Sequence, residues 1–471
     1  MKATRREVIA GLAAGSVVSG CRAVAAPADA ITPEAFGAKG DGRTNDTDAF
    51  AAMSAHVNAR GAGTIILRPV TYIVGKQAHT PGDSEKFGFT PFDIIHIVGC
   101  KGAVAIQGNG ARLRCASGLR YGGFDPRSGQ ALPDSRDNLK PKNRAVPYVG
   151  MIFIENCSGS VEISDLELDG NLGGHVAGGR YAKGGWQAAG TGIRLVGNVG
   201  EERLSRIRSH HHAQDGIILT AAIDRSGSTV VSDCVCENNG RQGCSITRGR
   251  NYSFERCHFN RTGRAGLGSS PGAGVDIEAE GGGTVRNVAF TDCEFSDNAG
   301  FALVAGSGDS ADATFTRCKF VGTTNWAAWP NKPGFRFSNC TFVGQIVHIY
   351  GDPDPARAAQ FMDCTFSDDP ALSPTGQVYG GRIGAKPIAI LTKSQNALFN
   401  RCNFNLVADM TLPMSTDVIY SDCTMSQRSP MPSRPGGTYL GSTTISGNAN
   451  LTGSHIRGTV TLNGRPLPPT A

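Results

Sequence analysis

Apolar and polar residues alternate over short stretches along most of the chain, and one pattern returns repeatedly. It consists of an apolar or aromatic residue, two polar positions, a cysteine, one polar position and another aromatic or apolar residue. Apolar residues spaced two apart are typical of a β-strand, and a supersecondary unit repeated at intervals of 21 to 38 residues indicates a solenoid. The pattern occupies residues 252–259, 288–295, 313–320, 335–342, 359–366, 397–404 and 418–425.

The repeating unit is therefore a coil of short strands. Glycine makes up 63 of the 471 residues, and long helical patterns are missing after residue 60. Coils of this length with Gly and Asn at their corners predict an all-β parallel β-helix. Near the N-terminus, Asp46 can cap a helix whose Phe50, Met53 and Val57 lie on one face, and such a helix would cover the open end of the first coil.

Glycines allow five coils to be aligned, at residues 190–196, 214–220, 241–247, 272–278 and 298–304. The alignment predicts two inward columns, namely Ile193, Ile217, Cys244, Val275, Phe301 and Leu195, Leu219, Ile246, Ile277, Leu303. It predicts two outward columns, namely Arg194, Ile218, Ser245, Asp276, Ala302 and Val196, Thr220, Thr247, Glu278, Val304.

The 14 cysteines fit a stacking position better than a disulfide framework. At least eight occupy one place in the coil, where small buried thiols behave as hydrophobic groups, so we expect a reduced internal ladder. Cys234 and Cys236 form the one close pair, and their side chains would point to opposite strand faces, which argues against a zinc site. The ladder comprises Cys234, Cys257, Cys293, Cys318, Cys340, Cys364, Cys402 and Cys423.

Residues 1–30 have the character of an export signal. Arg5 and Arg6 precede an apolar stretch too short to span a membrane, as in twin-arginine signals, and this predicts a periplasmic or cell-surface protein. Residues 18–21 resemble a lipoprotein box with Cys21 as the lipidated residue, and cleavage at the Ala-rich stretch 23–30 is the alternative. The formal charge of +6 falls to +4 without residues 1–21, which permits an anionic substrate and gives no indication of nucleic-acid binding.

The segment 36–42, followed by Asp46-Thr47, the strand 64–67, Pro69 and Tyr72, resembles the start of the pectate-lyase superfamily, which includes relatives of polygalacturonases and phage tailspikes. Val70 departs from the glycine that the family commonly has there. The resemblance continues through residues 165–171, 240–246 and 272–280. It implies a right-handed β-helix that binds or cleaves polysaccharide, and it leaves the reaction open because hydrolases, lyases, epimerases and binders share the scaffold.

Three acidic residues, Asp276, Glu278 and Glu280, are expected on one outer face. Like charges in a row are unfavourable unless a cation, a proton or a substrate engages them, so Ca²⁺ binding at these three residues is one possibility. Asp215 and Arg241 are expected at the preceding corner, where an arginine can hold a sugar carboxylate. The alternative is a solvated acidic face without a role.

Further candidates surround this patch. His211 is a possible acid or base, and its alternative is a turn histidine without a role. Asp165, Glu167 and Asp169 are interpreted mainly as structural. Loop aromatics either stack on sugars or pack on the coil: Tyr121, Phe124, Trp186, Trp326 and Trp329. The expected substrate-binding residues are Gln242, Arg194, Glu280, His210, His212 and Trp186.

We therefore expect an exported enzyme that cleaves glycosidic bonds by hydrolysis or β-elimination. A non-catalytic glycan-binding or structural envelope protein and a uronan epimerase are the alternatives. The catalytic set is Asp276, Glu278, Asp215, Arg241 and His211. The expected divisions are the signal (1–30), the cap and first coils (31–75), coils with a long loop insertion (76–150), the main coils (151–428) and a last coil with a cap (429–471).

Overall fold

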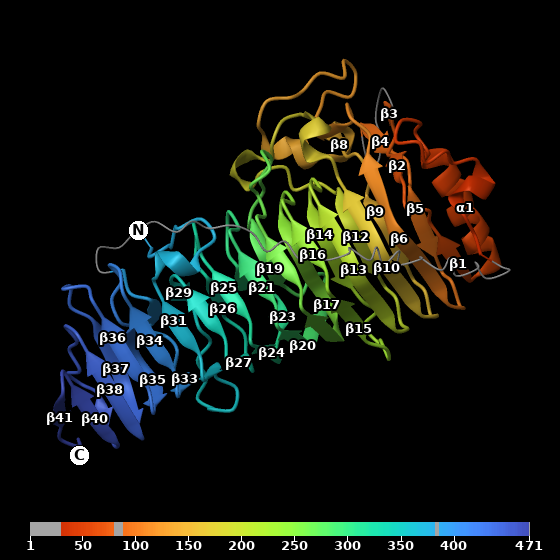
Figure 1. Ribbon diagram of the computed structural model, residues 1–471. Coiled ribbons are helices and arrows are strands. Elements are labelled where there is room, and N and C mark those ends of the chain that lie inside the picture. Colours follow the sequence, from red (N-terminus) through yellow and green to blue (C-terminus); the bar gives the residue numbers. More distant parts are fainter. Residues whose placement is uncertain (1–29, 80–87, 382–385, 471) are drawn as a thin grey trace, which may run out of the picture.

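The computed structural model describes residues 30–79, 88–381 and 386–470 as a long parallel β-helix (Figure 1). The expected signal and Cys21 lie outside the described residues. Each coil runs through three faces, which we number in chain order, and each strand pairs in parallel with its equivalent in the next coil. Seven longer strands bend at a corner and contribute to more than one face or turn: β6 (Val104–Cys115), β10 (Val161–Asp169), β13 (Glu202–His210), β17 (Gln242–Glu255), β20 (Thr284–Thr291), β35 (Met414–Ser421) and β37 (Arg434–Leu440).

The remaining strands of the coils fall into three series. Face 1 contains β1 (Gly63–Ile66), β15 (Thr229–Ser232), β23 (Asp309–Ser310), β24 (Ala313–Thr316), β27 (Arg336–Ser338), β30 (Gln360–Met362), β33 (Leu398–Asn400) and β39 (His455–Ile456). Face 2 contains β2 (Thr71–Val74), β16 (Val235–Glu237), β18 (His258–Asn260), β21 (Glu294–Ser296), β25 (Lys319–Val321), β28 (Thr341–Val343), β31 (Thr365–Ser367), β34 (Asn403–Leu406), β36 (Thr424–Gln427), β38 (Ser442–Ser446) and β40 (Thr459–Leu462). Face 3 contains β5 (Ile95–Val98), β9 (Gly150–Glu155), β12 (Thr191–Val196), β14 (Asp215–Thr220), β19 (Ala273–Ile277), β22 (Leu303–Ala305), β26 (Ala328–Pro330), β29 (Ile346–Val347) and β32 (Ala389–Leu391).

The aromatic residues of the repeat form the core. One column on face 1 stacks neighbouring rings 4.4–5.2 Å apart, and it consists of Phe254, Phe290, Phe315, Phe337, Phe361 and Phe399. A second column on face 2 stacks rings 4.5–5.5 Å apart, and it consists of Phe259, Phe295, Phe320, Phe342, Phe366 and Phe404. Burial of these rings in every coil supplies the main driving force for stacking the coils.

The ladder cysteines lie between these two columns, as expected. All eight are buried, and each of the 13 cysteines in the described part of the chain is a free thiol. The thiol of Cys340 donates to the carbonyl of Phe315 in the preceding coil at 3.3 Å, and Cys423 makes the same contact with Phe399 at 3.3 Å. Seven of the eight ladder thiols find such an acceptor on the preceding coil, whereas Cys234 donates to the carbonyl of Ser232 in its own coil.

The residue before each ladder cysteine turns the corner in the left-handed conformation. Arginine and aspartate alternate at much of this corner, and four bidentate ion pairs connect neighbouring coils there. The pairs are Arg206–Asp165, Arg256–Asp233, Arg317–Asp292 and Arg401–Asp363, with N–O distances of 2.6–2.9 Å. The expected structural role of Asp165 is thus confirmed, whereas the ion-pair ladder itself was not anticipated.

The capping helix is confirmed as α1 (Thr47–Arg60), whose Phe50, Met53 and Val57 are fully buried. The expected cap by the Asp46 side chain is wrong. Its carboxylate instead accepts hydrogen bonds from the backbone N–H groups of Lys39 and Gly40, at 2.7 and 3.1 Å, and fixes the preceding loop. No helix among the described residues is long and apolar enough to cross a membrane.

The insertion forms a small second sheet that projects from the N-terminal coils (Figure 1). Its strands are β3 (Gln77–His79), β4 (Phe89–Pro91), β7 (Arg120–Gly123), β8 (Arg144–Ala145) and β11 (Val176–Ala177). Six short 3₁₀ helices lie at the N-terminus and in loops: Pro33–Phe36, Arg136–Leu139, Pro141–Asn143, Leu172–Gly174, Ala182–Gly184 and Pro370–Leu372. At the other end, β41 (Arg465–Leu467) folds back antiparallel on β40 and closes the last coil.

The predicted inward columns hold on face 3 from Ile193 to Val275 and fail in the next coil. Leu303, not Phe301, pairs with Val275, because Gly300 aligns with Gly272 and not with Gly274. Phe301 consequently points outward and packs on two tryptophans. A bulge also shifts the neighbouring column, so that Thr220 pairs with Arg248.

Candidate functional site

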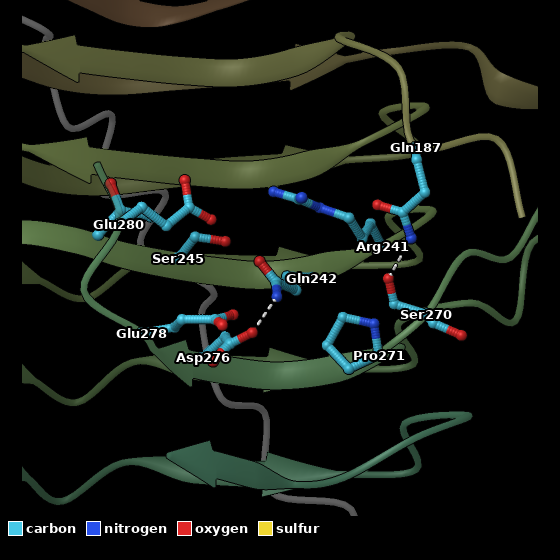
Figure 2. Close-up of a pocket in the computed structure, with 10 residues that line it drawn as sticks. Gln187, Arg241, Gln242, Ser245, Ser270, Pro271, Asp276, Glu278 and Glu280 are labelled. Atoms are coloured by element: carbon cyan, nitrogen blue, oxygen red, sulfur yellow. Dashed lines mark hydrogen bonds between the residues drawn. The ribbon is translucent and has the colours of Figure 1, made fainter. Parts of the chain in front are cut away.

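An acidic pocket of about 260 Å³ lies on the outer surface of face 3 (Figure 2). Its floor comes from β17 and β19, through Gln242, Ser245 and Asp276. Two loops form its wall, and they are joined by a 2.5 Å hydrogen bond from the side chain of Gln187 to the carbonyl of Ser270. The further lining residues are Arg241, Thr247, Pro271, Glu278 and Glu280. The structure thus brings Arg241, Gln242 and the three expected acidic residues together.

Asp215 and Arg241 form a buried ion pair beneath this pocket. Two parallel hydrogen bonds of 2.9 and 2.6 Å join the guanidinium to the carboxylate, and Ser245 Oγ donates a third at 2.7 Å. Burial lowers the pKa of Arg241 and the Asp215 carboxylate raises it, with a net upward shift that keeps the guanidinium charged. Asp215 is fully buried, so its expected direct catalytic role is contradicted, and its place is to hold Arg241, whose side chain is 18% exposed.

Asp276 is 6% exposed, and its Oδ2 accepts a 2.5 Å hydrogen bond from Gln242 Nε2. Burial and then the Glu278 carboxylate raise the pKa of Asp276 to about 8, against the opposing effect of Arg241. Asp276 is therefore protonated at neutral pH. Gln242 Oε1 is buried without a hydrogen-bond partner in the described structure, so the amide has a free acceptor beside this acid.

The sequence predicted Asp276, Glu278 and Glu280 on one strand. In the structure β19 ends at Ile277, and Glu278 and Glu280 lie in the segment that follows it. Backbone hydrogen bonds from Glu278 to Ile246 and from Glu280 to Thr247 keep both beside the pocket floor. Glu278 is half-buried and accepts a short hydrogen bond from Ser307 Oγ, whereas Glu280 is exposed.

The three carboxyls do not converge on one point. Over the described ranges, the single triplet of metal-ligating side chains with ligand atoms within 4.8 Å of one another is Asp169, His210 and His211. A Ca²⁺ site at Asp276, Glu278 and Glu280 stays a prediction, and it requires side-chain movement.

The three histidines do not join this pocket. His210 and His211 line a different pocket of about 270 Å³ with Arg112 and Arg114 on the face 2 side of the corner. Burial and then His210 lower the pKa of His211. The expected roles of His210 and His211 in the acidic pocket therefore have no support from their position.

His212 is fully buried inside the corner, where its Nδ1 lies 2.8 Å from Tyr148 Oη. Burial lowers its pKa to about 3, so the ring is neutral. This position contradicts the expected role of His212 in substrate binding.

Arg194 and Trp186 lie near the acidic pocket without lining it. Arg194 shares the outer face, stacks on Phe153 at 5.5 Å and has a pKa lowered by burial. Trp186 is held by hydrogen bonds to Ser269 and Gly178, and it packs on Tyr121. Its neighbour Gln187 reaches the pocket instead, and no sequence signal distinguished that residue.

The other loop aromatics divide into two groups. Tyr121 and Phe124 are 1% and 2% exposed, so they pack inside the insertion and cannot stack on a sugar. Trp326 and Trp329 are half-buried, and Trp329 stacks on His348 at 4.4 Å. Strand pairing places Asp276, Val304 and Trp329 in one outward column of successive coils, so Trp329 lies about 10 Å along the helix axis from Asp276.

The family model described as "Right handed beta helix region" matches residues 150–342. The chain folds as a right-handed parallel β-helix. Among solved structures, the N-terminal fragment of bacteriophage phi29 gene product 12 has a TM-score of 0.51 and 12% identity, over 93% of this chain and 72% of that one. The Azotobacter vinelandii mannuronan C-5 epimerase AlgE4 A-module has a TM-score of 0.46 and 15% identity, over 92% of this chain and 100% of that one. An exopolygalacturonase from Thermotoga maritima has a TM-score of 0.41 and 12% identity, over 94% of this chain and 93% of that one. At these identities the likeness concerns the fold, and no curated protein matches the chain.

Proposed function

We propose that this β-helix is a polysaccharide-cleaving enzyme whose active site is the acidic pocket on face 3. The observation that carries the proposal is the position of Asp276, a buried acid on the pocket floor beside two further carboxyls and a fixed arginine. Burial and the neighbouring charges keep a proton on Asp276 at neutral pH, as a general acid requires.

In the proposed hydrolysis, Asp276 donates its proton to the glycosidic oxygen as the bond breaks. Glu278 is the second carboxyl, and it activates water or attacks the sugar carbon. Gln242 can serve both forms of Asp276, because Nε2 donates to the carboxylate and the free Oε1 can accept from the acid after rotation of the amide.

The substrate contacts proposed here come from two features of the same outer surface. Arg241, held by Asp215, presents its partly exposed guanidinium to a sugar carboxylate or hydroxyl. Trp329, two coils away, offers a ring on which a sugar about two residues distant can stack. Together they favour a chain-like, anionic or neutral polysaccharide that lies along the helix axis.

Incubation with a panel of polysaccharides tests the proposal. Release of reducing ends without absorbance from unsaturated uronates indicates hydrolysis, and both signals together indicate β-elimination. Exchange of the C5 proton without cleavage indicates an epimerase. Binding without any of these signals, unchanged in Asp276→Asn, contradicts the proposed enzyme and favours a glycan-binding protein.

We also propose export by the twin-arginine pathway, supported by Arg5, Arg6 and the apolar stretch that follows. A reporter fused to residues 1–30 should leave the cytoplasm, and changing both arginines to lysine should retain it. Labelling with a lipid precursor, with Cys21→Ala as the control, distinguishes a lipid anchor from cleavage in the Ala-rich stretch.

A further inference from the structure

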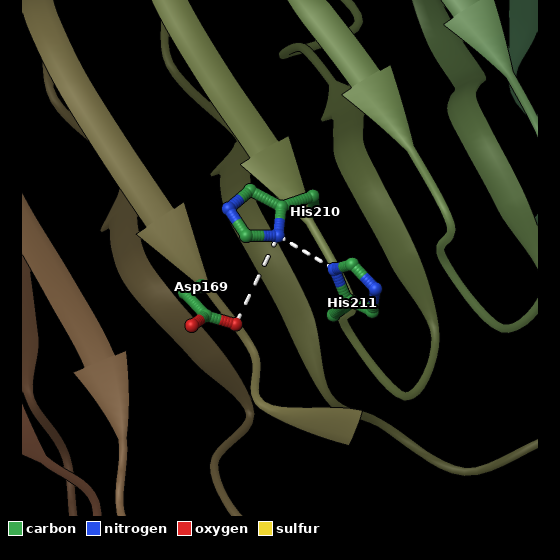
Figure 3. A group of neighbouring side chains, drawn as sticks. All are labelled: Asp169, His210 and His211. Carbon is green, nitrogen blue, oxygen red and sulfur yellow. Dashed lines mark hydrogen bonds and ion pairs between the residues drawn. The ribbon is translucent and has the colours of Figure 1, made fainter. Parts of the chain in front are cut away.

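A second cluster of chemistry-bearing side chains lies where β10 and β13 end on face 2, around Asp169, His210 and His211 (Figure 3). It shares no lining residue with the acidic pocket. Asp169 and His210 are neighbours across the strand pair, and His211 follows in the left-handed conformation that starts the turn. The proposed function uses none of these groups.

The orientation of His210 is set by a carboxylate behind it. His210 Nε2 lies 2.9 Å from Glu167 Oε1, so Nε2 carries the proton that this hydrogen bond needs. In the neutral ring, Nδ1 then has no proton, and its lone pair accepts from His211 Nδ1 or can bind a cation. Such a carboxylate–histidine pair is the usual support of a metal-binding imidazole, because it fixes the tautomer and raises the basicity of the other nitrogen.

The lone pair of His210 Nδ1 points at two further ligand atoms. His211 Nδ1 lies 2.6 Å away and Asp169 Oδ1 lies 3.8 Å away. Asp169 is fixed by a 2.5 Å hydrogen bond from Arg112 to Oδ2 and a 2.8 Å bond from the N–H of Asn171 to Oδ1. Oδ1 keeps a second lone pair for a cation. Side-chain exposures of 4% for His210 and 6% for Asp169 show that the two groups are held in place.

We propose that Asp169, His210 and His211 bind a divalent transition-metal ion, for which Zn²⁺ is the best match to two imidazoles and a carboxylate. A tetrahedral ion about 2 Å from each ligand sets the ligand atoms about 3.3 Å apart. The His210–His211 distance must therefore widen, and the His210–Asp169 distance must shorten, each by less than about 1 Å. The proton between the two Nδ1 atoms leaves, and the His211 ring can take up a proton at Nε2, so its charge is unchanged.

Three protein ligands leave the fourth position of the metal open. The adjoining pocket of about 270 Å³ is lined by Arg112, Arg114 and Asn171. An ion of charge +2 beside these arginines makes the open position suited to water or a small anion.

Calorimetric titration of the purified chain with Zn²⁺ tests the site, and Co²⁺ absorbance reports its coordination. We expect one Zn²⁺ per chain and a tetrahedral Co²⁺ spectrum. His211→Asn should abolish both, because asparagine tolerates the left-handed conformation and removes the imidazole. Glu167→Gln should weaken binding about 10- to 100-fold without removing a ligand.

His455→Ala in the last coil, an exposed histidine far along the chain, is the matched control and should bind as the parent does. Thermal unfolding of each variant checks that it is folded. Absence of stoichiometric Zn²⁺ binding, or equal binding by the parent and folded His211→Asn, overturns the proposal. Because the cluster and the acidic pocket share no lining residue, either result leaves the proposed cleavage site unaffected.

Discussion

Replacing Asp276 by asparagine should remove activity and at the same time stabilise the folded protein, by an amount that depends on pH. Asparagine keeps the shape of the side chain and an acceptor for Gln242 Nε2. It removes the carboxyl that the pocket holds protonated. Asp276 has a pKa raised from 3.8 to about 8 by burial and the Glu278 carboxylate.

The direction of the change in stability with pH follows from the raised pKa of Asp276. The folded state binds this proton more tightly than the unfolded state, so the contribution to stability is fully present below pH 4 and is lost as the pH rises to 8. The loss is about 1.4 kcal/mol per pH unit over this window, or about 4 kcal/mol at pH 7. Asp276→Asn should therefore have nearly the parent's stability at pH 4 and exceed it by up to about 4 kcal/mol at pH 7.

Thermal unfolding of both proteins between pH 4 and pH 8.5 measures the effect. For a chain of 471 residues the unfolding entropy is about 1 kcal/mol/K, so the difference in Tm should grow by about 4 °C between pH 4 and pH 7. Asp215→Asn is the matched control, since it leaves Arg241 buried without its partner and should lower stability by about 3–5 kcal/mol. A difference between Asp276→Asn and the parent that stays constant over the whole pH range would refute the assigned protonation state.

Three further predictions follow from the same structure. Glu278→Gln should abolish cleavage and change the free energy of unfolding by about 0.5 kcal/mol or less, because the side chain is half-exposed; retained cleavage by this variant excludes Glu278 as the second carboxyl. Trp329→Ala should raise KM for long oligosaccharides and leave that for the shortest substrates unchanged, as steady-state kinetics on a length series would show; an equal effect at all lengths contradicts a stacking role. The buried thiols of Cys293, Cys318, Cys340 and Cys364 should resist alkylation in the native protein and react in denaturant without reductant, as measured by mass spectrometry; a need for reductant would show that they are oxidised.

The sequence predicts the fold well because the repeat is carried by inward residues. Phe and Cys recur at fixed places in the coil, and burial permits few alternatives there. The coil at 298–304 shows the limit of this reasoning. Residues 272–274 contain two glycines, Gly272 and Gly274, that can be aligned with Gly300. The alignment with Gly274 shifted the predicted register by two residues, so that Phe301 and not Leu303 was paired with Val275. The strand pairing of Val275 with Leu303 and the backbone hydrogen bond from Gly300 to Gly272 resolve this register.

The candidate site could be predicted in part. Period-two alternation placed Asp276 outward beside Ser245, and strand pairing confirms that register. Gln187 and Ser270 belong to loops far from the strand in sequence, and no periodicity governs how such loops fold back on the helix. The three histidines at 210–212, which the sequence placed beside the acidic pocket, lie elsewhere for a related reason. His211 adopts a left-handed conformation at a corner, so alternation no longer tells which side its neighbours face.

The corner between β13 and β14 connects the two candidate sites through one short turn. Residues 211–214 connect β13, which ends in His210, to β14, which begins with Asp215. His212 fills the inside of the turn against Tyr148, and its backbone N–H donates to Asn239 in the next coil at 3.0 Å. Because these contacts are buried, the turn fixes His210 on one side and the Asp215–Arg241 pair on the other. Substitution of the buried His212 is therefore expected to disturb both sites together, whereas Glu167→Gln and Glu278→Gln should each affect one site alone.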